Sequence, residues 1–327
     1  MYLCIQNLEG EVVLHRNMEA KPEPLLKAIE PFQEDIVIGV ECIFTWYWLA
    51  DLCAQHKIPF ILGHALYMKA IHGGKAKNDR IDSRKIAALM RGGTFPLAFA
   101  YPAEMRATRD LLRRRNYLTR KRAELLSHIK NTNSQYNMEP FAASIASKKN
   151  RVGVLDQFID PDVRLSMEAD LALIANLEDQ RSKLELHITK RAKGHDPQAL
   201  YRLRSVPGIG SIISLILLYE ICDINRFPRV QDFASYARLV KCSKESAGKR
   251  SGTSGGKIGN VHLKWAFSEA AVLFLKGNPE GMKFKNKLVK VHGKGKALSI
   301  LAHKLGRAVY FILKNDEAFD MKKFLKT

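Results

Sequence analysis

The sequence predicts an α/β amino-terminal domain, a middle region of two long helices and a mainly helical carboxyl-terminal domain. Short β-branched runs alternate with helical patterns up to about residue 100, which is typical of a layered α/β domain. Residues 101–195 hold long stretches in which leucines recur at helical or heptad spacing. Residues 196–327 contain apolar helical segments around glycine-containing turns. We therefore expect three domains: 1–100, 101–195 and 196–327.

In residues 1–100, the spacing of apolar and β-branched residues predicts strands and helices. Tyr2–Ile5 and Val12–His15 flank a polar turn and predict a hairpin. The run Ile36–Val40 is β-branched and predicts a strand, and Phe60–Leu62 predicts another. Helices are expected over 45–55 and over 82–91, where Gly92 and Gly93 end the second one.

Two long helices are expected in the middle region. The stretch from Ala103 to about Gln135 contains neither Gly nor Pro, and a second helical stretch runs over 166–193. A break near Glu139–Pro140 favours an antiparallel pair. Its leucine stripe packs either within the chain or against a second copy, and the pattern does not decide between them. Beyond it, helices are expected over 261–276 and 297–314, and a loop over 243–260.

The charge balance narrows the class of partner. The 327 residues include 53 Lys and Arg against 33 Asp and Glu, a net charge of +20. A polyanion is the natural partner, with nucleic acid first and an acidic membrane surface second. The longest apolar stretch, 36–50, is short and contains Glu41, so we expect no membrane span. Five scattered cysteines indicate neither a disulfide framework nor a zinc site, and no signal peptide is visible; both fit a reducing cytosol.

Three acidic residues are candidate metal ligands. Glu41 directly follows a predicted strand, where α/β proteins collect ligand-binding groups. Asp79 and Asp82 lie three apart at a helix start, so both can lie on one face of the first turn and share a divalent cation. For Glu41, a surface position is equally consistent. For the aspartates, an N-cap role of Asp82 is favoured by spacing alone.

Three basic or glycine-rich segments are candidates for binding phosphates. The Pro-Gly-Ile-Gly turn with Gly208 and Gly210 resembles a helix-hairpin-helix, although a tight turn between buried helices is the plainer interpretation. The glycine- and serine-rich segment 244–260 offers a close backbone approach and cationic side chains, and composition alone favours a phosphate-clamping loop over a nucleophile. The cations expected to contact a nucleic-acid backbone are Arg113, Arg114, Arg115, Arg120, Lys121, Lys249, Arg250 and Lys257.

Taken in order, five segments resemble the transposases of the insertion-sequence 110/1111 family. They are VIGVECIFTWYW, KAKNDRIDSRKIA, SVPGIGSIIS, DINRFPRVQDFASYARLV and ESAGKRSGTSGGKIGNVHLKW, and they extend over nearly the whole chain. Each segment is a weak signal, whereas five in the same order are specific. The resemblance implies an RNase H-like (RuvC-like) domain with a DEDD set of acids, a coiled-coil region and a carboxyl-terminal domain with a catalytic serine.

The same resemblance implies the chemistry. Glu41, Asp79 and Asp82 match three of the four acids that hold Mg²⁺, and Ser246 matches the serine that attacks DNA and forms a phosphoserine link. Ser251 and Ser254 are fallback candidates. Double-stranded DNA, a guide RNA encoded by the element, and assembly into a homodimer or tetramer are the implied partners. The expected location is the bacterial cytoplasm, at the nucleoid.

One departure from the family pattern concerns the first acid. In the family this Asp lies on an initial strand, whereas the present sequence starts at MYLCIQ, which resembles the second strand. The sheet is therefore expected to lack a central strand. A start site placed too far downstream and a degenerate copy both account for this. A catalytically impaired DNA-binding remnant and a RuvC-like nuclease that uses metal and water are the alternative functions.

Overall fold

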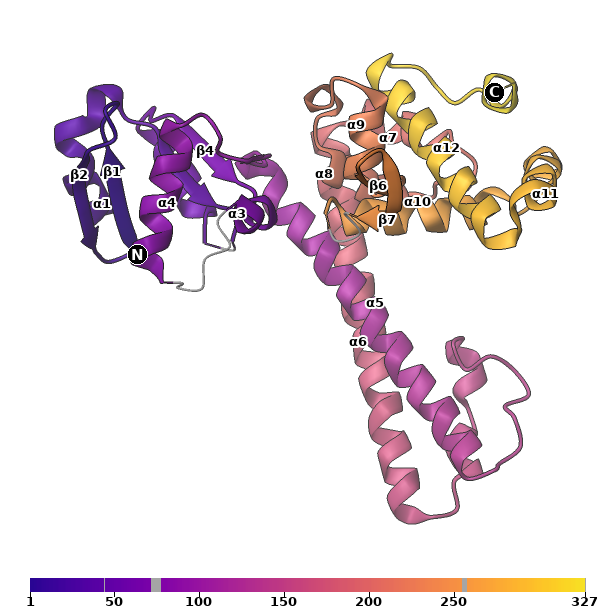
Figure 1. Ribbon diagram of the computed structural model, residues 1–327. Helices are drawn as coiled ribbons and strands as arrows, with labels where there is room; N and C mark the ends of the chain where they lie inside the picture. The colour runs from indigo at the N-terminus through magenta and orange to yellow at the C-terminus, as the bar shows by residue number, and fades with distance from the viewer. Residues whose placement is uncertain (44, 72–77, 255–257, 327) are drawn as a thin grey trace. The chain divides into compact units, whose positions relative to one another are not determined.

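The computed structural model describes residues 1–43, 45–71, 78–254 and 258–326. The chain divides into two compact units, Met1–Glu104 and Met105–Thr327 (Figure 1). The first boundary lies close to the predicted one. The long-helix region and the carboxyl-terminal domain, predicted as separate domains, form one unit, because Leu112 and Ile188 from the long helices belong to the same hydrophobic cluster as the carboxyl-terminal helices.

The first unit begins with the predicted hairpin. Strand β1 (Tyr2–Gln6) pairs antiparallel with β2 (Val12–Asn17), with an irregular register at its end. Helix α1 (Pro22–Ile29) follows and was not predicted; proline at its start suits a first helical turn. A 3₁₀ segment, η1 (Glu30–Asp35), leads into the next strand.

A second sheet holds the remaining strands of this unit. Strand β3 (Ile38–Glu41) runs parallel to β4 (Phe60–Gly63) through the connecting helix α2 (Tyr47–Gln55), and β5 (Leu97–Ala98) is antiparallel to β4. Among the described residues, this three-stranded sheet and the β1–β2 hairpin are separate sheets.

Two further helices complete the first unit, α3 (Ala65–Ile71) and α4 (Asp79–Arg91). Helix α4 starts three residues earlier than predicted. It packs along β1, and at its far end Met90 lies against Gly39 of β3, where an added Cβ would come within 2.3 Å of the Met90 sulfur. Glycine at position 39 therefore lets the end of α4 approach the strand closely.

The second unit begins with the predicted pair of long helices, which run side by side in Figure 1: α5 (Ala103–Gln135) and α6 (Pro161–His195). Their far ends share a small core in which Ile129 and Ile174 pack with Phe158 of the connecting segment. That segment contains two short 3₁₀ turns, η2 (Lys148–Arg151) and η3 (Val154–Gln157).

The rest of the second unit packs around one apolar helix, α8, whose residues 213–221 are all buried. A helix that is apolar on every side has to lie in the interior. Its neighbours include Phe233, Phe267 and Phe274. The elements of this part are α7 (Pro197–Arg204), α8 (Ser211–Ile221), η4 (Ile224–Arg226), α9 (Val230–Tyr236), β6 (Cys242–Ser246), β7 (Lys249–Ser254), α10 (Val261–Phe274), α11 (Pro279–His292), α12 (Lys294–Lys314) and α13 (Met321–Leu325).

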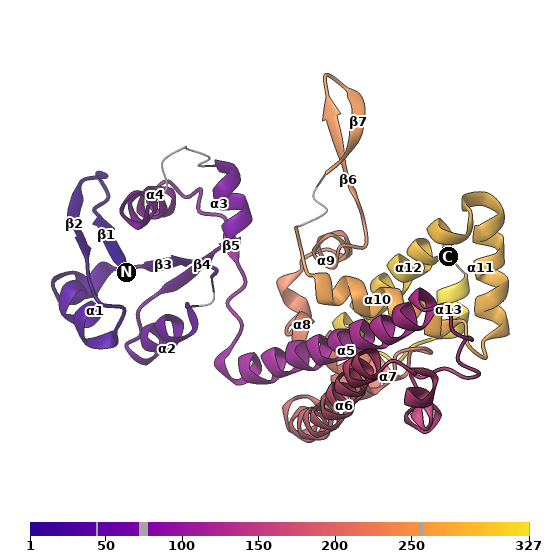
Figure 2. The same ribbon diagram turned by 90° about the horizontal axis from the view of Figure 1, so that it is seen from below.

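Two sequence expectations for this part are corrected. The predicted loop over 243–260 is in large part an antiparallel hairpin, β6–β7, which projects from the helices of its unit (Figure 2). Helices α9, α11 and α13 were not predicted. In the described part of the chain, no helix is both long and apolar enough to cross a bilayer.

Candidate catalytic and nucleic-acid-binding residues

Glu41 occupies the end of a strand, as predicted. It is the last residue of β3, lies beside Gly63 of β4 in the register, and is half-buried. The backbone continues the pairing for one more step, because the Cys42 N–H donates to the Gly63 carbonyl over 2.8 Å. The carboxylate thus lies at the carboxyl edge of the two parallel strands, a common position for ligand-binding groups.

The aspartate pair lies in the first turn of α4. Asn78, and not Asp82, is the N-cap: its side-chain oxygen accepts from the Ile81 N–H over 2.8 Å. The prediction of Asp82 as N-cap is therefore wrong, because the helix begins earlier. Asp79 is exposed and Asp82 is half-buried. Two carboxylates on one turn are hard oxygen ligands of the kind that Mg²⁺ takes together with phosphate oxygens, so this donor set fits a divalent cation.

The three acids do not form one cluster. Among the described residues, no group of three His, Cys, Asp or Glu side chains is placed to hold a metal ion. One close contact of α4 with β3 is made at the end of the helix, between Met90 and Gly39. Asp82 lies eight residues earlier, about 12 Å back along the helix axis. The aspartate pair thus lies away from the contact between Met90 and Gly39.

The β6–β7 hairpin places Ser246 at its tip. Ser246 and Lys249 are directly opposed in the ladder and flank a two-residue turn, Ala247–Gly248. Both turn residues have positive φ (50° and 72°), as a type I′ turn requires. Opposed residues of an antiparallel ladder project to the same face, so the Ser246 hydroxyl and the Lys249 ammonium are neighbours on an exposed tip.

The two fallback serines occupy different places on the same hairpin. Ser251 lies at the irregularity of the register, where Lys244 is opposite Gly252 and Glu245 is opposite Arg250. Ser254 pairs with Cys242 at the base of the hairpin. Of the cations predicted here, Lys249 is exposed, the side chain of Arg250 is outside the described part, and Lys257 lies outside the described residues.

The base of the hairpin is anchored by hydrogen bonds to the end of α9 and the residues that follow it. The Asn260 N–H donates to the Tyr236 carbonyl over 2.6 Å, and Arg238 donates to the Gly259 carbonyl over 2.9 Å. Gly259 has φ +94°, and an added Cβ would come within 2.5 Å of the Tyr236 carbonyl oxygen. Only glycine satisfies both conditions. The exit from the hairpin into α10 is therefore fixed in position.

A buried carboxylate lies beneath that base. Glu220 of α8 is 2% exposed and accepts from Arg113 over 2.7 and 3.0 Å, from Arg109 over 3.0 Å and from Asn260 over 2.8 Å. Burial raises the pKa of Glu220, but the hydrogen bond from Arg113 and the charges of Arg109 and Arg113 outweigh it and bring the pKa to about 2. Asn260 also caps α10, accepting from the N–H of His262. One ionised side chain thus connects α5, α8 and the start of α10.

The arginine run of α5 divides into two groups. Arg113 is bound to Glu220, and Arg115 donates to Glu185 of α6 over 2.7 Å. These two side chains stabilise contacts within the protein, which corrects the expectation that the whole run faces a nucleic acid. Arg114 and Arg120 are exposed and keep that predicted role, while Lys121 is exposed and ion-paired with Glu124.

The Pro-Gly-Ile-Gly turn connects α7 to α8. Gly208 has φ +83°, and an added Cβ would lie 2.4 Å from the backbone nitrogen of Phe274 in α10. Its lack of a side chain is therefore explained by packing within the protein. Gly210 differs: it is exposed, precedes α8 and faces open space. Of the two glycines, Gly210 is the one that leaves a helix N-terminus accessible to a phosphate.

The sequence interpretation passed over one cationic segment. Helices α11 and α12 contribute six lysines within residues 283–296, and Asp and Glu are absent from 281 to 315. The signal was available, because an acid-free interval of that length is unusual in a chain that is 26% charged. It was missed because the lysines are spread over two helices and do not form a compact run.

Comparisons with known proteins match two regions of the chain to transposases. A family model described as "Transposase IS116/IS110/IS902 family" matches residues 200–286, and a DEDD transposase model of the IS110 type matches residues 1–138. The first region includes the β6–β7 hairpin, and the second includes Glu41, Asp79 and Asp82. The chain is thus a transposase of an insertion sequence.

Two curated relatives indicate which family of transposases the chain resembles. The transposase for insertion sequence element IS1111A of Coxiella burnetii is 22% identical over 258 residues, which is 74% of this chain and 68% of the relative. The insertion element IS110 uncharacterized 43.6 kDa protein of Streptomyces coelicolor is 30% identical over 103 residues, 32% of this chain and 25% of that protein. With the two family models, these place the chain in the IS110 family of transposases.

Proposed function

We propose that this transposase cuts and rejoins DNA through a covalent link between Ser246 and a DNA phosphate. The observation that carries the proposal is the position of Ser246 at the exposed tip of a hairpin, directly opposite Lys249. A protruding tip can reach a phosphate of duplex DNA, and the ammonium group attracts it. Ser251 and Ser254 lie further down the hairpin and have less reach.

The chemistry conserves the number of phosphoester bonds. The Ser246 oxygen bonds to phosphorus while the bond from phosphorus to one sugar oxygen breaks. The serine proton is given up and the departing sugar oxygen takes up a proton, so no proton is consumed overall. A free hydroxyl of another strand then attacks the phosphoserine and regenerates the serine. Because the bond energy is retained, rejoining needs no nucleotide cofactor.

The acidic residues are proposed to hold a divalent metal, Mg²⁺ in our expectation. Asp79 and Asp82 offer two carboxylates on one helical turn, and Glu41 offers a carboxylate on a separate element, at the edge of β3. When bound, such an ion neutralises charge on a phosphate. The RNase H-like assignment of the first unit belongs to the same proposal.

The proposed partners follow from charge and from the family. A net charge of +20 supports binding of double-stranded DNA, with Arg114, Arg120, Lys249 and the turn at Gly210 as candidate contacts. A guide RNA and assembly into a homodimer or tetramer are proposed from the resemblance to the family.

The test compares serine variants in a strand-exchange assay with DNA binding measured in parallel. Ser246→Ala is expected to abolish exchange and the covalent protein–DNA adduct while leaving DNA affinity within about twofold. Ser243→Ala, on the same exposed strand, is the matched control and is expected to retain both activities. Ser251→Ala and Ser254→Ala decide between the three candidates.

Each other outcome leads to a different conclusion. Unchanged exchange by Ser246→Ala would show that the nucleophile is a different group. Cleavage without any trapped adduct would indicate hydrolysis by metal-activated water, as in a nuclease. Binding without cleavage by the unaltered chain would indicate a DNA-binding remnant.

A further inference from the structure

Helices α11 and α12 form a long basic segment that contains almost no acidic residue. Residues 281–315 include no Asp or Glu and nine Lys and Arg side chains: Lys283, Lys285, Lys287, Lys290, Lys294, Lys296, Lys304, Arg307 and Lys314. About a tenth of the chain thus contributes nearly half of its net charge of +20. Most of this segment lies beyond residue 286, where the matched transposase region ends.

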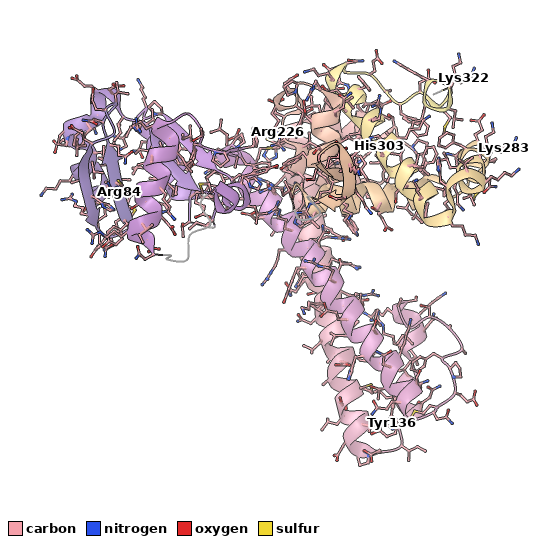
Figure 3. All side chains as sticks on the ribbon, viewed as in Figure 1. Arg84, Tyr136, Arg226, Lys283, His303 and Lys322 are labelled. Atoms are coloured by element: carbon pink, nitrogen blue, oxygen red, sulfur yellow. The ribbon has the colours of Figure 1, made fainter. Side chains whose placement is uncertain are left out.

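Most of these cations are directed to solvent. Lys283, Lys287 and Lys290 are exposed, and their spacing of four and three residues places them on one face of α11. Lys283 lies on the outer side of this helix (Figure 3). Lys296 and Arg307 are exposed on α12, which packs beside α11. Within the described part of the chain, none of these five side chains lies within 4.0 Å of a carboxylate oxygen.

Two other cations of the segment have structural roles. The Lys304 ammonium lies 4.6 Å from the ring centre of Phe284 and 5.1 Å from that of Phe324, and burial lowers its pKa. Such a cation–π contact joins α11, α12 and α13. Lys314 donates to the side chain of Asn225 over 2.8 Å. The exposed lysines are therefore a separate group that the fold itself does not use.

Unpaired like charges at this density repel one another and cost stability, unless an anionic partner compensates for them. We propose that the exposed cations of α11 and α12, here called the cationic face, bind the phosphate backbone of double-stranded DNA; they are Lys283, Lys287, Lys290, Lys296 and Arg307. The proposal goes beyond the Ser246 chemistry, because this face is distinct from the β6–β7 hairpin.

Charge complementarity argues for a duplex. The first and last of the three lysines of α11 are seven residues apart, about 10 Å along the helix. Duplex DNA carries one phosphate per about 1.7 Å of axis, so a similar length presents about six negative charges. Lysines act as mobile point charges without the fixed geometry that reads bases. The face is therefore expected to hold DNA of any sequence in position.

The experiment measures the affinity of the full chain for a mixed-sequence DNA duplex at several salt concentrations. The variant Lys283→Gln/Lys287→Gln/Lys290→Gln is expected to lose at least about tenfold in affinity at 0.1 M salt. Its plot of log affinity against log salt is expected to be shallower by about 2 to 3, because each released counterion contributes about 0.9.

The matched control removes three charges from ion-paired lysines. Lys21, Lys183 and Lys323 are exposed and lie 2.7, 2.7 and 3.3 Å from Glu19, Asp179 and Glu317. Their triple Gln variant has the same net charge as the test variant and is expected to retain the wild-type salt slope within about 0.5. Equal losses in both variants would overturn the proposal, because net charge would then explain them.

Two further measurements distinguish a DNA surface from an RNA surface and the binding proposal from the serine mechanism. A loss confined to a structured RNA stem-loop, with duplex DNA binding unchanged, would overturn the proposal in favour of an RNA surface. Formation of the Ser246 adduct at saturating DNA is expected to persist in the test variant. If that adduct is absent from the wild type but the salt slope still changes as expected, the binding surface stands and only the serine mechanism fails.

Discussion

The arginines of α5 and the lysines of α11–α12 carry the same sign of charge but differ in their surroundings. Arg109 and Arg113 meet the buried Glu220, and Arg115 meets Glu185 of α6. Further along, Arg122 and Arg151 share Glu178. The exposed lysines of α11 and α12 face solvent instead.

This difference separates structural cations from cations available to a partner. Arginine presents several donors in a planar fork that matches a carboxylate, and Arg113 and Arg151 both bind their glutamates through two nitrogens. Lysine has a compact, well-hydrated ammonium on a flexible stem, which suits a solvent-exposed surface. A cluster of positive residues in the sequence is thus a binding surface only where acids are missing from the fold around it.

The largest effect is expected from removing the carboxylate that the α5 arginines share. Glu220→Gln removes the negative charge that the guanidinium groups of Arg109 and Arg113 share, in a site where Glu220 is 2% exposed. The free energy of unfolding is expected to fall by about 3 kcal/mol, as for other broken buried pairs. Urea denaturation of the full chain measures it.

The control for this prediction is Glu124→Gln. It removes the partner of Lys121 on the exposed surface of α5, the helix that also carries Arg109 and Arg113. Exposed pairs are worth less than about 1 kcal/mol, so this variant should remain close to the wild type. Similar losses in the two variants would contradict the distinction between buried and exposed pairs.

An intermediate effect on the free energy of unfolding is expected when the pH is lowered. The hydrogen bond from Arg151 is the main cause that brings the pKa of Glu178 to about 2, against an ordinary value of 4.5. A carboxyl group whose pKa is lower in the folded than in the unfolded protein stabilises the fold, and it does so fully at pH values above its unfolded-state pKa. This stabilisation is lost as the pH falls from about 4.5 towards 2, where the folded protein also takes up the proton. Glu220, whose pKa is also about 2, acts in the same direction.

The measurement is the unfolding free energy between pH 6 and pH 2.5 for the wild type and for Glu178→Gln. The variant is expected to be less stable at pH 6 and to depend less steeply on pH below 4.5. A wild-type pH dependence that persists unchanged in the variant would show that Glu178 is not one of the responsible groups.

The smallest effect is expected on the lysine side. Lys287→Gln removes an exposed charge near the like charges of Lys283 and Lys290, so the unfolding free energy should stay within about 0.5 kcal/mol of the wild type. A small gain at low salt that vanishes at high salt is the expected sign of relieved repulsion. Thermal denaturation at two salt concentrations measures it, and a loss above about 1 kcal/mol would show that Lys287 takes part in the fold.

Periodicity predicted the elements that carry a strong local signal. The hairpin β1–β2, the strands β3 and β4 and the helix α5 follow from short β-branched runs or from long intervals without Gly and Pro. Helix α11 was missed because its Pro279, Gly281 and alternating lysines weaken the helical pattern. The β6–β7 hairpin was taken for a loop because Gly and Ser are poor strand formers.

The candidate site was only partly predictable for the same physical reason. The sequence made Glu41 and the Asp79–Asp82 pair candidates, and the family resemblance added Ser246. The position of Ser246 opposite Lys249 follows from a hairpin register that a turn with two positive φ angles sets. No residue pattern predicted that Asn260 and Arg113 would both contact Glu220, because these residues are far apart along the chain.

The sequence by itself determined the charge of this transposase, the order of its α/β and helical regions and the residue types available for chemistry. These are local properties, fixed by composition and by spacing along the chain. Only the tertiary structure decided which arginines are neutralised by a carboxylate and which lysines remain exposed, and that the acids of the first unit lie on different elements. Such outcomes depend on which distant segments fold against each other, and burial then sets whether a charge is paired within the protein or left for a partner.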